Sequence, residues 1–249
     1  MEIIALTGKG GVGKTSLSAA IVKNLVLRHP DKKILAIDAD PAVGLATVLD
    51  ISVTKTIDDI RKEIIKGVED KETKDIAQLL GEAKYQLMDA IAEKDGYAFI
   101  AIGRPEAAGC YCKINSYLKE VIAILADKFD YVVIDGEAGI EQINRRVMEK
   151  VTHLILVTDA SKKGCDVIKS IKNVADDLVM YKKVGVIANR LPSDEVVDKM
   201  DIGDLQLLAS ITSDEELAMC DICGDSVFDL GIDTKIMAGA SKALDCLGL

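Results

Sequence analysis

Residues 8–15 read GKGGVGKT, and they directly follow the short apolar run IIAL at residues 3–6. The pattern G-x-x-x-x-G-K-[ST] between a strand and a helix is typical of a phosphate-binding loop. Glycines let backbone N–H groups approach phosphates closely, and the N-terminus of the following helix adds the positive end of its dipole. We therefore expect the chain to bind a nucleotide, with Lys14 at the β- and γ-phosphates and the hydroxyl of Thr15 on Mg²⁺.

The loop carries one lysine more than the motif requires. Lys9 follows its first glycine, whereas the ordinary loop needs only Lys14. The second lysine suggests that hydrolysis needs two chains. The residues expected to contact the nucleotide here are Gly8, Lys9, Gly10, Gly11, Val12, Gly13, Lys14, Thr15 and Ser16.

Composition narrows the class of protein. The 249 residues are 49% hydrophobic and 29% charged, which suits a globular domain with a substantial core. The net charge of −10 argues against nucleic acid as a main partner, because phosphate backbones attract basic surfaces. Neither a leader segment nor an apolar stretch of about 18 residues is evident, so we expect a cytoplasmic protein with no membrane partner. In that compartment the six cysteines favour metal or redox roles over disulfides.

Strand-like runs alternate with helical patterns along the chain. Nearly continuous apolar runs such as YVVI at 131–134 suit parallel strands buried on both faces. The alternation predicts a single α/β domain over residues 1–249, with a doubly wound, mainly parallel sheet of about seven strands. The expected strands are 2–7, 33–38, 97–102, 131–135, 153–158, 184–188 and 205–211, and the expected helices include 14–28, 116–128 and 163–180. The charged region 54–95 is expected to be a helical insertion beside the nucleotide site.

Acidic residues follow two of the expected strands. Asp38 ends the expected strand 33–38 and Asp40 follows it closely, whereas Asp135 ends the expected strand 131–135. Ligands bind at the carboxyl ends of strands in open α/β sheets. A carboxylate there can hold Mg²⁺, directly or through water, or position the attacking water.

These segments together resemble the deviant-Walker-A ATPases, a family that includes nitrogenase iron protein, MinD and ParA, over nearly the whole chain. The resemblance implies ATP or ADP as ligand and a homodimer in which Lys9 reaches phosphates bound by the partner subunit. It also implies that Asp40 positions the hydrolytic water, that Asp135 senses the γ-phosphate and that Asn189, with Arg190, contacts adenine. The family usually has Ile-Pro where this chain has Ile211-Thr212, which puts backbone contacts to the base there in doubt.

A Cys-x-Cys motif, Cys110-Tyr111-Cys112, lies in a predicted loop ahead of the helix that Asn115 or Ser116 would cap. Two thiolates do not complete a four-coordinate site, but two chains supply four. A set of four thiolates suits Zn²⁺, Ni²⁺ or an iron–sulfur cluster. The string from Gly103 through Cys112 resembles the CooC-type nickel-insertion ATPases, although Ala107-Ala108 replaces the usual Gly-Pro. That resemblance implies that Cys110 and Cys112 bind Ni²⁺ or Zn²⁺ across a dimer. It also implies a client nickel enzyme, either carbon monoxide dehydrogenase or acetyl-CoA synthase.

Two other functions stay open. One is an electron-transfer ATPase like nitrogenase iron protein, although that family draws its cluster cysteines from two distant loops. The other is a ParA- or MinD-like positioning ATPase, which the acidic balance disfavours. The C-terminal tail has an apolar helical stripe but only two cations, Lys235 and Lys242, too few for a membrane anchor. We expect the stripe to pack against the domain; its residues are Ile236, Ala240, Ala243, Leu244 and Leu247. Cys220 and Cys223 form a C-x-x-C that we interpret as structural, because zinc sites usually show two such pairs. Cys165 and Cys246 are expected to be buried helix residues, and His29 and His153 to be surface or strand-edge residues.

Overall fold

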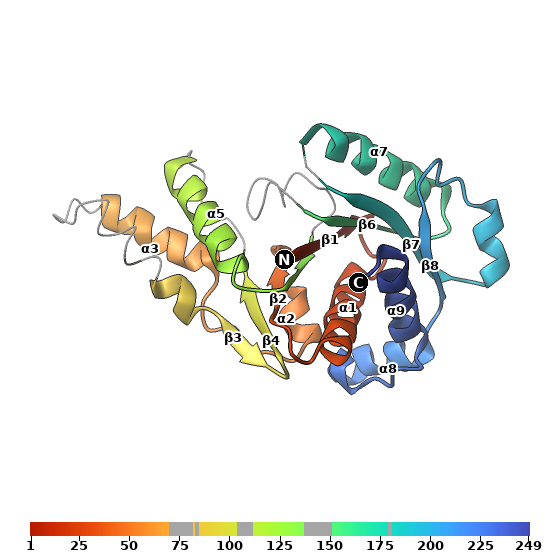
Figure 1. The fold of residues 1–249 in the computed structure, drawn as a ribbon, viewed down its shortest axis with the longest axis horizontal. Helices are drawn as coiled ribbons and strands as arrows, with labels where there is room; N and C mark the ends of the chain where they lie inside the picture. The colour runs from red at the N-terminus through yellow and green to blue at the C-terminus, as the bar shows by residue number, and fades with distance from the viewer. Residues whose placement is uncertain (70–81, 83–84, 104–111, 137–150, 179–180) are drawn as a thin grey trace.

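The computed structural model describes residues 1–69, 82, 85–103, 112–136, 151–178 and 181–249. One eight-stranded sheet, in the order β3-β4-β2-β5-β1-β6-β7-β8, runs through the molecule (Figure 1). Its strands are β1 Glu2–Gly8, β2 Ile34–Asp38, β3 Ala92–Lys94, β4 Tyr97–Ala101, β5 Tyr131–Asp135, β6 His153–Thr158, β7 Lys183–Leu191 and β8 Leu207–Thr212. All neighbours pair in parallel except β3 and β4. The predicted doubly wound α/β fold is confirmed.

Helices cover both faces of the sheet. The α-helices described are α1 Lys14–Arg28, α2 Gly44–Val48, α3 Ile57–Glu69, α5 Cys112–Ala126, α7 Lys162–Leu178, α8 Glu215–Cys223 and α9 Lys235–Leu247, with 3-10 helices η1 Asp194–Lys199 and η2 Val227–Asp229. Apolar side chains of α3, α5 and α7 pack on one face, and those of α1, α2 and α9 pack on the other. This division is what right-handed crossovers between parallel strands produce.

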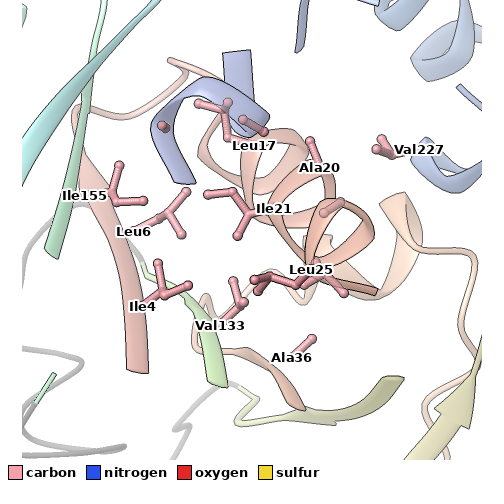
Figure 2. Close-up of a cluster of buried hydrophobic side chains, with 14 of the residues drawn as sticks. Ile4, Leu6, Leu17, Ala20, Ile21, Leu25, Ala36, Val133, Ile155 and Val227 are labelled. Carbon is pink, nitrogen blue, oxygen red and sulfur yellow. The ribbon is translucent and has the colours of Figure 1, made fainter. Parts of the chain in front are cut away.

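The helix α1 forms the centre of the second layer. Its buried face meets side chains from three neighbouring strands, as Figure 2 shows for Leu17, Ala20, Ile21 and Leu25 against Ile4, Leu6, Val133 and Ile155. Burying a large apolar side chain contributes about 1.5–3 kcal/mol. This packing fixes the helix that begins at the phosphate loop.

The region 54–95 differs from the predicted helical insertion. It contains α3 and a short helical segment at 85–89, but it ends in β3, an antiparallel edge strand that the sequence analysis missed. Residues 70–81 and 83–84 lie outside the described part of the chain. The missed signal is Asp95-Gly96, where both residues have positive φ (48° and 86°). A D-G pair of this kind closes a two-residue hairpin.

The start of α5 is a second correction. The helix begins at Cys112, ahead of the predicted 116, so Asn115 and Ser116 lie inside it and do not cap it. Residues 112–126 contain neither proline nor glycine, so nothing in them delays the helix.

The C-terminal stripe behaves as predicted. Ile236, Ala240, Ala243, Leu244 and Leu247 are all buried, because α9 packs on α1 and β8. Among the helices described, none has the length and apolar character needed to cross a membrane.

Three of the remaining expectations concern burial. Cys165 is buried as expected, but Cys246 is exposed although it lies on α9. His153 begins β6 and is buried instead of lying at the surface, because β6 is an interior strand whose neighbours cover the ring.

Candidate functional site: a phosphate loop and the strand ends beside it

The loop between β1 and α1 has the geometry of a phosphate cradle. Gly13 adopts φ +85° at the N-cap of α1, a conformation that costs glycine little. Gly8 packs so closely on β6 that a Cβ atom there would lie 2.0 Å from the carbonyl oxygen of Val157. A Cβ on Gly10, in contrast, would meet nothing within 4 Å. One glycine therefore fixes the loop to the sheet, and the other borders open space that a phosphate can fill.

Two consecutive residues at the end of β7 hold the loop from the side. The buried amide of Asn189 donates from Nδ2 to the carbonyl of Val12 at 2.8 Å. Arg190, at φ +57°, donates from its guanidinium to the carbonyl of Gly11 at 2.8 Å. The two residues predicted to contact adenine thus lie against the phosphate loop. A contact between Asn189 and adenine stays a prediction.

The two loop lysines point to different partners. Lys14 is buried and donates to the carbonyl of Lys9 at 3.2 Å. The ammonium group of Lys9 lies 2.5 Å from Oδ2 of Asp159 and 3.3 Å from the hydroxyl of Ser161. Lys9, which is expected to act on the partner subunit, is therefore bound to its own subunit in this monomer.

The carboxylate that binds Lys9 is held in place by its own neighbours. Oδ1 of Asp159 accepts hydrogen bonds from the hydroxyl of Ser161 at 2.5 Å and from its backbone N–H at 3.1 Å. A Cβ on Gly164 would lie 2.3 Å from the same oxygen, so only glycine leaves room for the carboxylate. Burial tends to raise the pKa of Asp159, but the hydrogen bonds from Lys9 and Ser161 hold it below its usual range.

Asp159 and Ser161 are site residues that were not predicted from the sequence. Both follow β6, so their place after a parallel strand, like that of Asp38 and Asp135, is the signal that could have identified them.

Two buried carboxylates end adjacent strands beside the loop. Asp38 of β2 and Asp135 of β5 are directly in register and almost fully buried. Oδ2 of Asp38 accepts from the backbone N–H of Leu45 at 2.9 Å, and Oδ1 accepts from that of Asp40 at 3.1 Å. Burial and the neighbouring charge of Asp135 raise the pKa of Asp38 to about 7.

Asp135 retains an unused acceptor. Its Oδ1 accepts from the hydroxyl of Ser18 at 3.0 Å, whereas its buried Oδ2 has no hydrogen-bond partner among the residues that the structure describes. Burial raises the pKa of Asp135 to about 6, and the nearby hydroxyl groups of Thr15 and Ser18 offset only part of that effect. Two crowded carboxylates with a free oxygen suit a divalent cation, so these residues fit the predicted Mg²⁺ site.

Asp40 lies in the segment between β2 and α2. Its Oδ1 accepts from the backbone N–H of Ala42 at 2.9 Å, which shapes the turn. Its predicted role with the hydrolytic water is not tested by this arrangement.

The strand that precedes the Cys-x-Cys motif in the chain, β4, ends at the same edge of the sheet. Cys110 lies outside the described residues, and Cys112 begins α5. The motif follows β4, which pairs with β2, and the N–H of Ile102 donates to the carbonyl of Asp38 at 2.8 Å. Within the described ranges, no group of three or more His, Cys, Asp or Glu side chains forms a metal site. Cys220 is buried and Cys223 exposed on α8, and both thiols are free.

A phosphate loop flanked by buried aspartates at the ends of β2 and β5 defines a P-loop nucleotide hydrolase. The sequence model of the anion-transporting ATPase family matches residues 1–192, and the chain belongs to this family. It is accordingly an ATPase, as predicted.

Proteins of similar sequence align with nearly the whole chain. An uncharacterized ATP-binding protein of Methanocaldococcus jannaschii is 37% identical over 94% of this chain and 93% of its own. The carbon monoxide dehydrogenase accessory protein CooC of Rhodospirillum rubrum is 29% identical over 96% of this chain and 94% of its own. The septum site-determining protein MinD of Pyrococcus horikoshii, solved with Mg-ADP, is similar in fold, with a TM-score of 0.69, 23% identity and coverage of 99% and 95%.

Proposed function

We propose that this ATPase is a metallochaperone that dimerises with its nucleotide and inserts nickel into carbon monoxide dehydrogenase or acetyl-CoA synthase. The observation that carries the proposal is the position of Cys110-Tyr111-Cys112 in the chain. The motif follows β4 in the chain and ends at Cys112, the first residue of α5, and β4 ends beside the strand that presents Asp38 to the nucleotide site. Full-length similarity to CooC supports the same function.

In this proposal Ni²⁺, or Zn²⁺ in its place, is the cargo of the protein. Cys110 and Cys112 of one subunit and the same pair of the other would supply four thiolates, a set that suits either ion. Dimerisation therefore completes the site, and any step that separates the subunits releases the metal. Such a site needs no further ligand from the described part of the chain.

The nucleotide site supplies the driving reaction. The N–H groups of the loop and Lys14 bind the phosphates, and Lys9 leaves Asp159 to meet the phosphates of the partner subunit, as a cation supplied in trans. Asp40 orients the attacking water. Thr15, Asp38 and Asp135 would hold Mg²⁺, which neutralises phosphate charge when bound. Asn189 and Arg190 keep the loop in its binding conformation.

Metal content measured in each nucleotide state tests the proposal. Purified protein would be loaded with Ni²⁺ or Zn²⁺, and bound metal and dimer fraction determined with ADP and with a non-hydrolysable ATP analogue. We expect one metal ion per dimer, lost in Cys110→Ser and Cys112→Ser while ATP binding survives. The pair Cys220→Ser and Cys223→Ser is the matched control and should bind metal normally. Normal metal binding by the variants at 110 or 112 would contradict the assigned site.

The same preparation separates the other candidate functions. Iron and sulfide at four each per dimer after anaerobic purification would indicate an electron-transfer ATPase. Salt-sensitive DNA binding or lipid-stimulated hydrolysis would indicate a positioning ATPase, a class that the similarity to MinD over most of the chain keeps open.

A further inference from the structure

The helix α8 presents apolar side chains to solvent. Of its nine residues, only Leu217 and Cys220 face the rest of the domain, since Leu217 is half-buried and Cys220 is buried. Met219 is 57% exposed and Ile222 is 76% exposed. Residues three apart lie on the same side of a helix, so these two side chains form an apolar stripe on the outer face of α8. In Figure 1, α8 lies at the lower edge of the molecule, below α9.

Acidic side chains accompany this stripe. Residues 213–234 contain seven Asp or Glu and neither Lys nor Arg. Within the described part of the chain, none of the seven forms an ion pair. They are Asp214, Glu215, Glu216, Asp221, Asp225, Asp229 and Asp233. Burial raises the pKa of the Cys220 thiol, and the charges of Asp221 and Asp225 raise it further, so these carboxylates lie close to the helix.

Lys23 and Lys235 reach the segment 213–234, but both donate to backbone carbonyls. The ammonium group of Lys23 donates to the carbonyls of Phe228 at 2.7 Å and Leu230 at 2.5 Å. That of Lys235 donates to the carbonyl of Ser213 at 2.7 Å. These lysines hold the backbone of the segment in place and form no ion pair with its carboxylates, so the surface keeps its negative charge.

Both ends of α8 are fixed. Oδ1 of Asp214 accepts from two backbone N–H groups of the first turn, both at 3.1 Å, and its Oδ2 accepts from the N–H of Ile236 at 2.9 Å, at the start of α9. At the other end Gly224 adopts φ +75°, and the N–H of Asp225 donates to the carbonyl of Cys220 at 3.0 Å. The stripe therefore lies on a preorganised helix, which lowers the entropic cost of binding a partner.

We propose that the outer face of α8 is a docking surface for a cationic amphipathic helix of another protein. The apolar side of that helix covers Met219 and Ile222, and its Lys or Arg side chains pair with the acids that flank the stripe, as charged residues flank the apolar seam between paired helices. Charge disfavours a second copy of this chain here, because a twofold interface would place the acidic surface against itself. Nucleic acids and anionic membranes are repelled for the same reason. The proposal goes beyond nickel delivery and needs neither bound metal nor a particular nucleotide.

A synthetic peptide tests this surface. The probe is a fluorescent peptide of about five helical turns, with Leu along one side and Lys on both flanks of the Leu stripe. Its affinity for the full chain, with ADP and at physiological salt, would be measured by fluorescence anisotropy. A peptide of the same composition in scrambled order has the same charge but no stripe. We expect the ordered peptide to bind at least about tenfold more tightly than the scrambled one.

Surface variants then locate the binding. Ile222→Ser and Met219→Ser should each weaken binding of the ordered peptide at least about fivefold without changing the melting temperature, since both side chains are exposed. Ile124→Ser is the matched control, because Ile124 is 50% exposed on α5, which covers the other face of the sheet. Asp221→Lys should weaken binding at least about threefold. Asp177→Lys changes the net charge equally on α7, away from α8, and should keep the wild-type affinity.

Three results would overturn the proposal. Equal affinity for the ordered and scrambled peptides would show only a general attraction of cations to an acidic protein. Equal affinity of Ile222→Ser and Ile124→Ser for the ordered peptide would place the binding elsewhere. Self-association of the wild type with ADP in sedimentation velocity, lost in Ile222→Ser, would assign this face to a second copy of the chain. Metal loading enters none of these measurements, so failure of the nickel proposal leaves them unaffected.

Discussion

The ammonium group of Lys9 lies 2.5 Å from a carboxylate oxygen of Asp159 on the same chain. The two residues are 150 positions apart, and β1 and β6 bring them together because they are neighbours in the sheet. Lys9, which we propose to act on the other subunit of a dimer, thus forms an ion pair within its own subunit when the chain is alone. Dimerisation must exchange that ion pair for contacts across the interface.

The first prediction concerns this exchange. Asp159→Asn removes the charge that holds Lys9, so we expect the dimer fraction with a non-hydrolysable ATP analogue to rise. An ion pair that is partly exposed contributes about 0.2–1 kcal/mol, and dimerisation breaks one such pair in each subunit. The dimerisation constant should therefore rise by up to roughly thirtyfold. Sedimentation velocity at several protein concentrations measures it.

Asp176→Asn is the control, because Asp176 pairs with Lys172 on α7, away from the loop. Lys9→Gln should act in the opposite direction, with turnover lowered at least about tenfold and monomer nucleotide binding nearly intact. A dimerisation constant that is equal in Asp159→Asn and wild type would remove Asp159 from this role.

The second prediction concerns the hydrogen bonds from β7 to the phosphate loop. Arg190→Ala frees the carbonyl of Gly11, and a hydrogen bond from a charged donor is worth about 1.5–3 kcal/mol. Because Arg190 is exposed, we expect the lower end, a loss of about tenfold in ATP affinity by titration calorimetry. Arg28→Ala is the control, since Arg28 also donates to carbonyls, those of Leu249 and Ser241, but far from the loop. ATP affinity that falls equally in both variants would indicate general destabilisation.

The third prediction concerns pH. The pKa of Asp38 is raised to about 7, and the pKa of the same group in the unfolded chain is about 4. Between these values the folded chain binds more protons, so the free energy of unfolding must fall as pH rises from about 4 to 7. Urea denaturation without nucleotide at pH 5, 6, 7 and 8 should show a fall on the order of 2 kcal/mol. Mg²⁺ competes with the proton, so its stabilising effect should grow over the same window.

Asp38→Asn removes this contribution because the amide does not titrate, so the pH dependence should become shallower. A part of the same sign remains from Asp135, whose pKa is also raised. His153 contributes with the opposite sign, since burial lowers its pKa and stability is lost as pH falls, but it does so in both proteins. A slope that is the same in Asp38→Asn and wild type would show that another group is responsible.

The fourth prediction separates two glycines of one loop. Gly8→Ala forces a Cβ against the carbonyl of Val157, and overpacking of this kind costs about 1–3 kcal/mol or more. Gly10→Ala meets no atom within 4 Å and should leave the free energy of unfolding within about 0.5 kcal/mol of wild type. Its methyl group instead enters the phosphate space, so ATP affinity should fall. If Gly10→Ala binds ATP like wild type, the phosphate does not lie beside Gly10.

Local patterns in the sequence determined the fold class and the phosphate loop. The loop needs only glycines, a lysine and a hydroxyl at fixed spacing, and the buried parallel strands need only continuous apolar runs, so neighbouring residues carry both signals. An element without such a local pattern is missed, which explains why β3 was not predicted. The strand β3 has three residues and no apolar pattern, and only the Asp95-Gly96 turn reveals it.

Tertiary structure alone decided which distant residues meet at the site. Sheet order places Asp159 beside Lys9, Asn189 beside Val12 and the end of β4 beside Asp38, and none of these pairs is close in sequence. The physical reason is that strand order results from packing two helical layers onto one sheet, and that packing depends on the whole chain. The sequence thus identified the chemical groups, and the fold determined which of them act on one another.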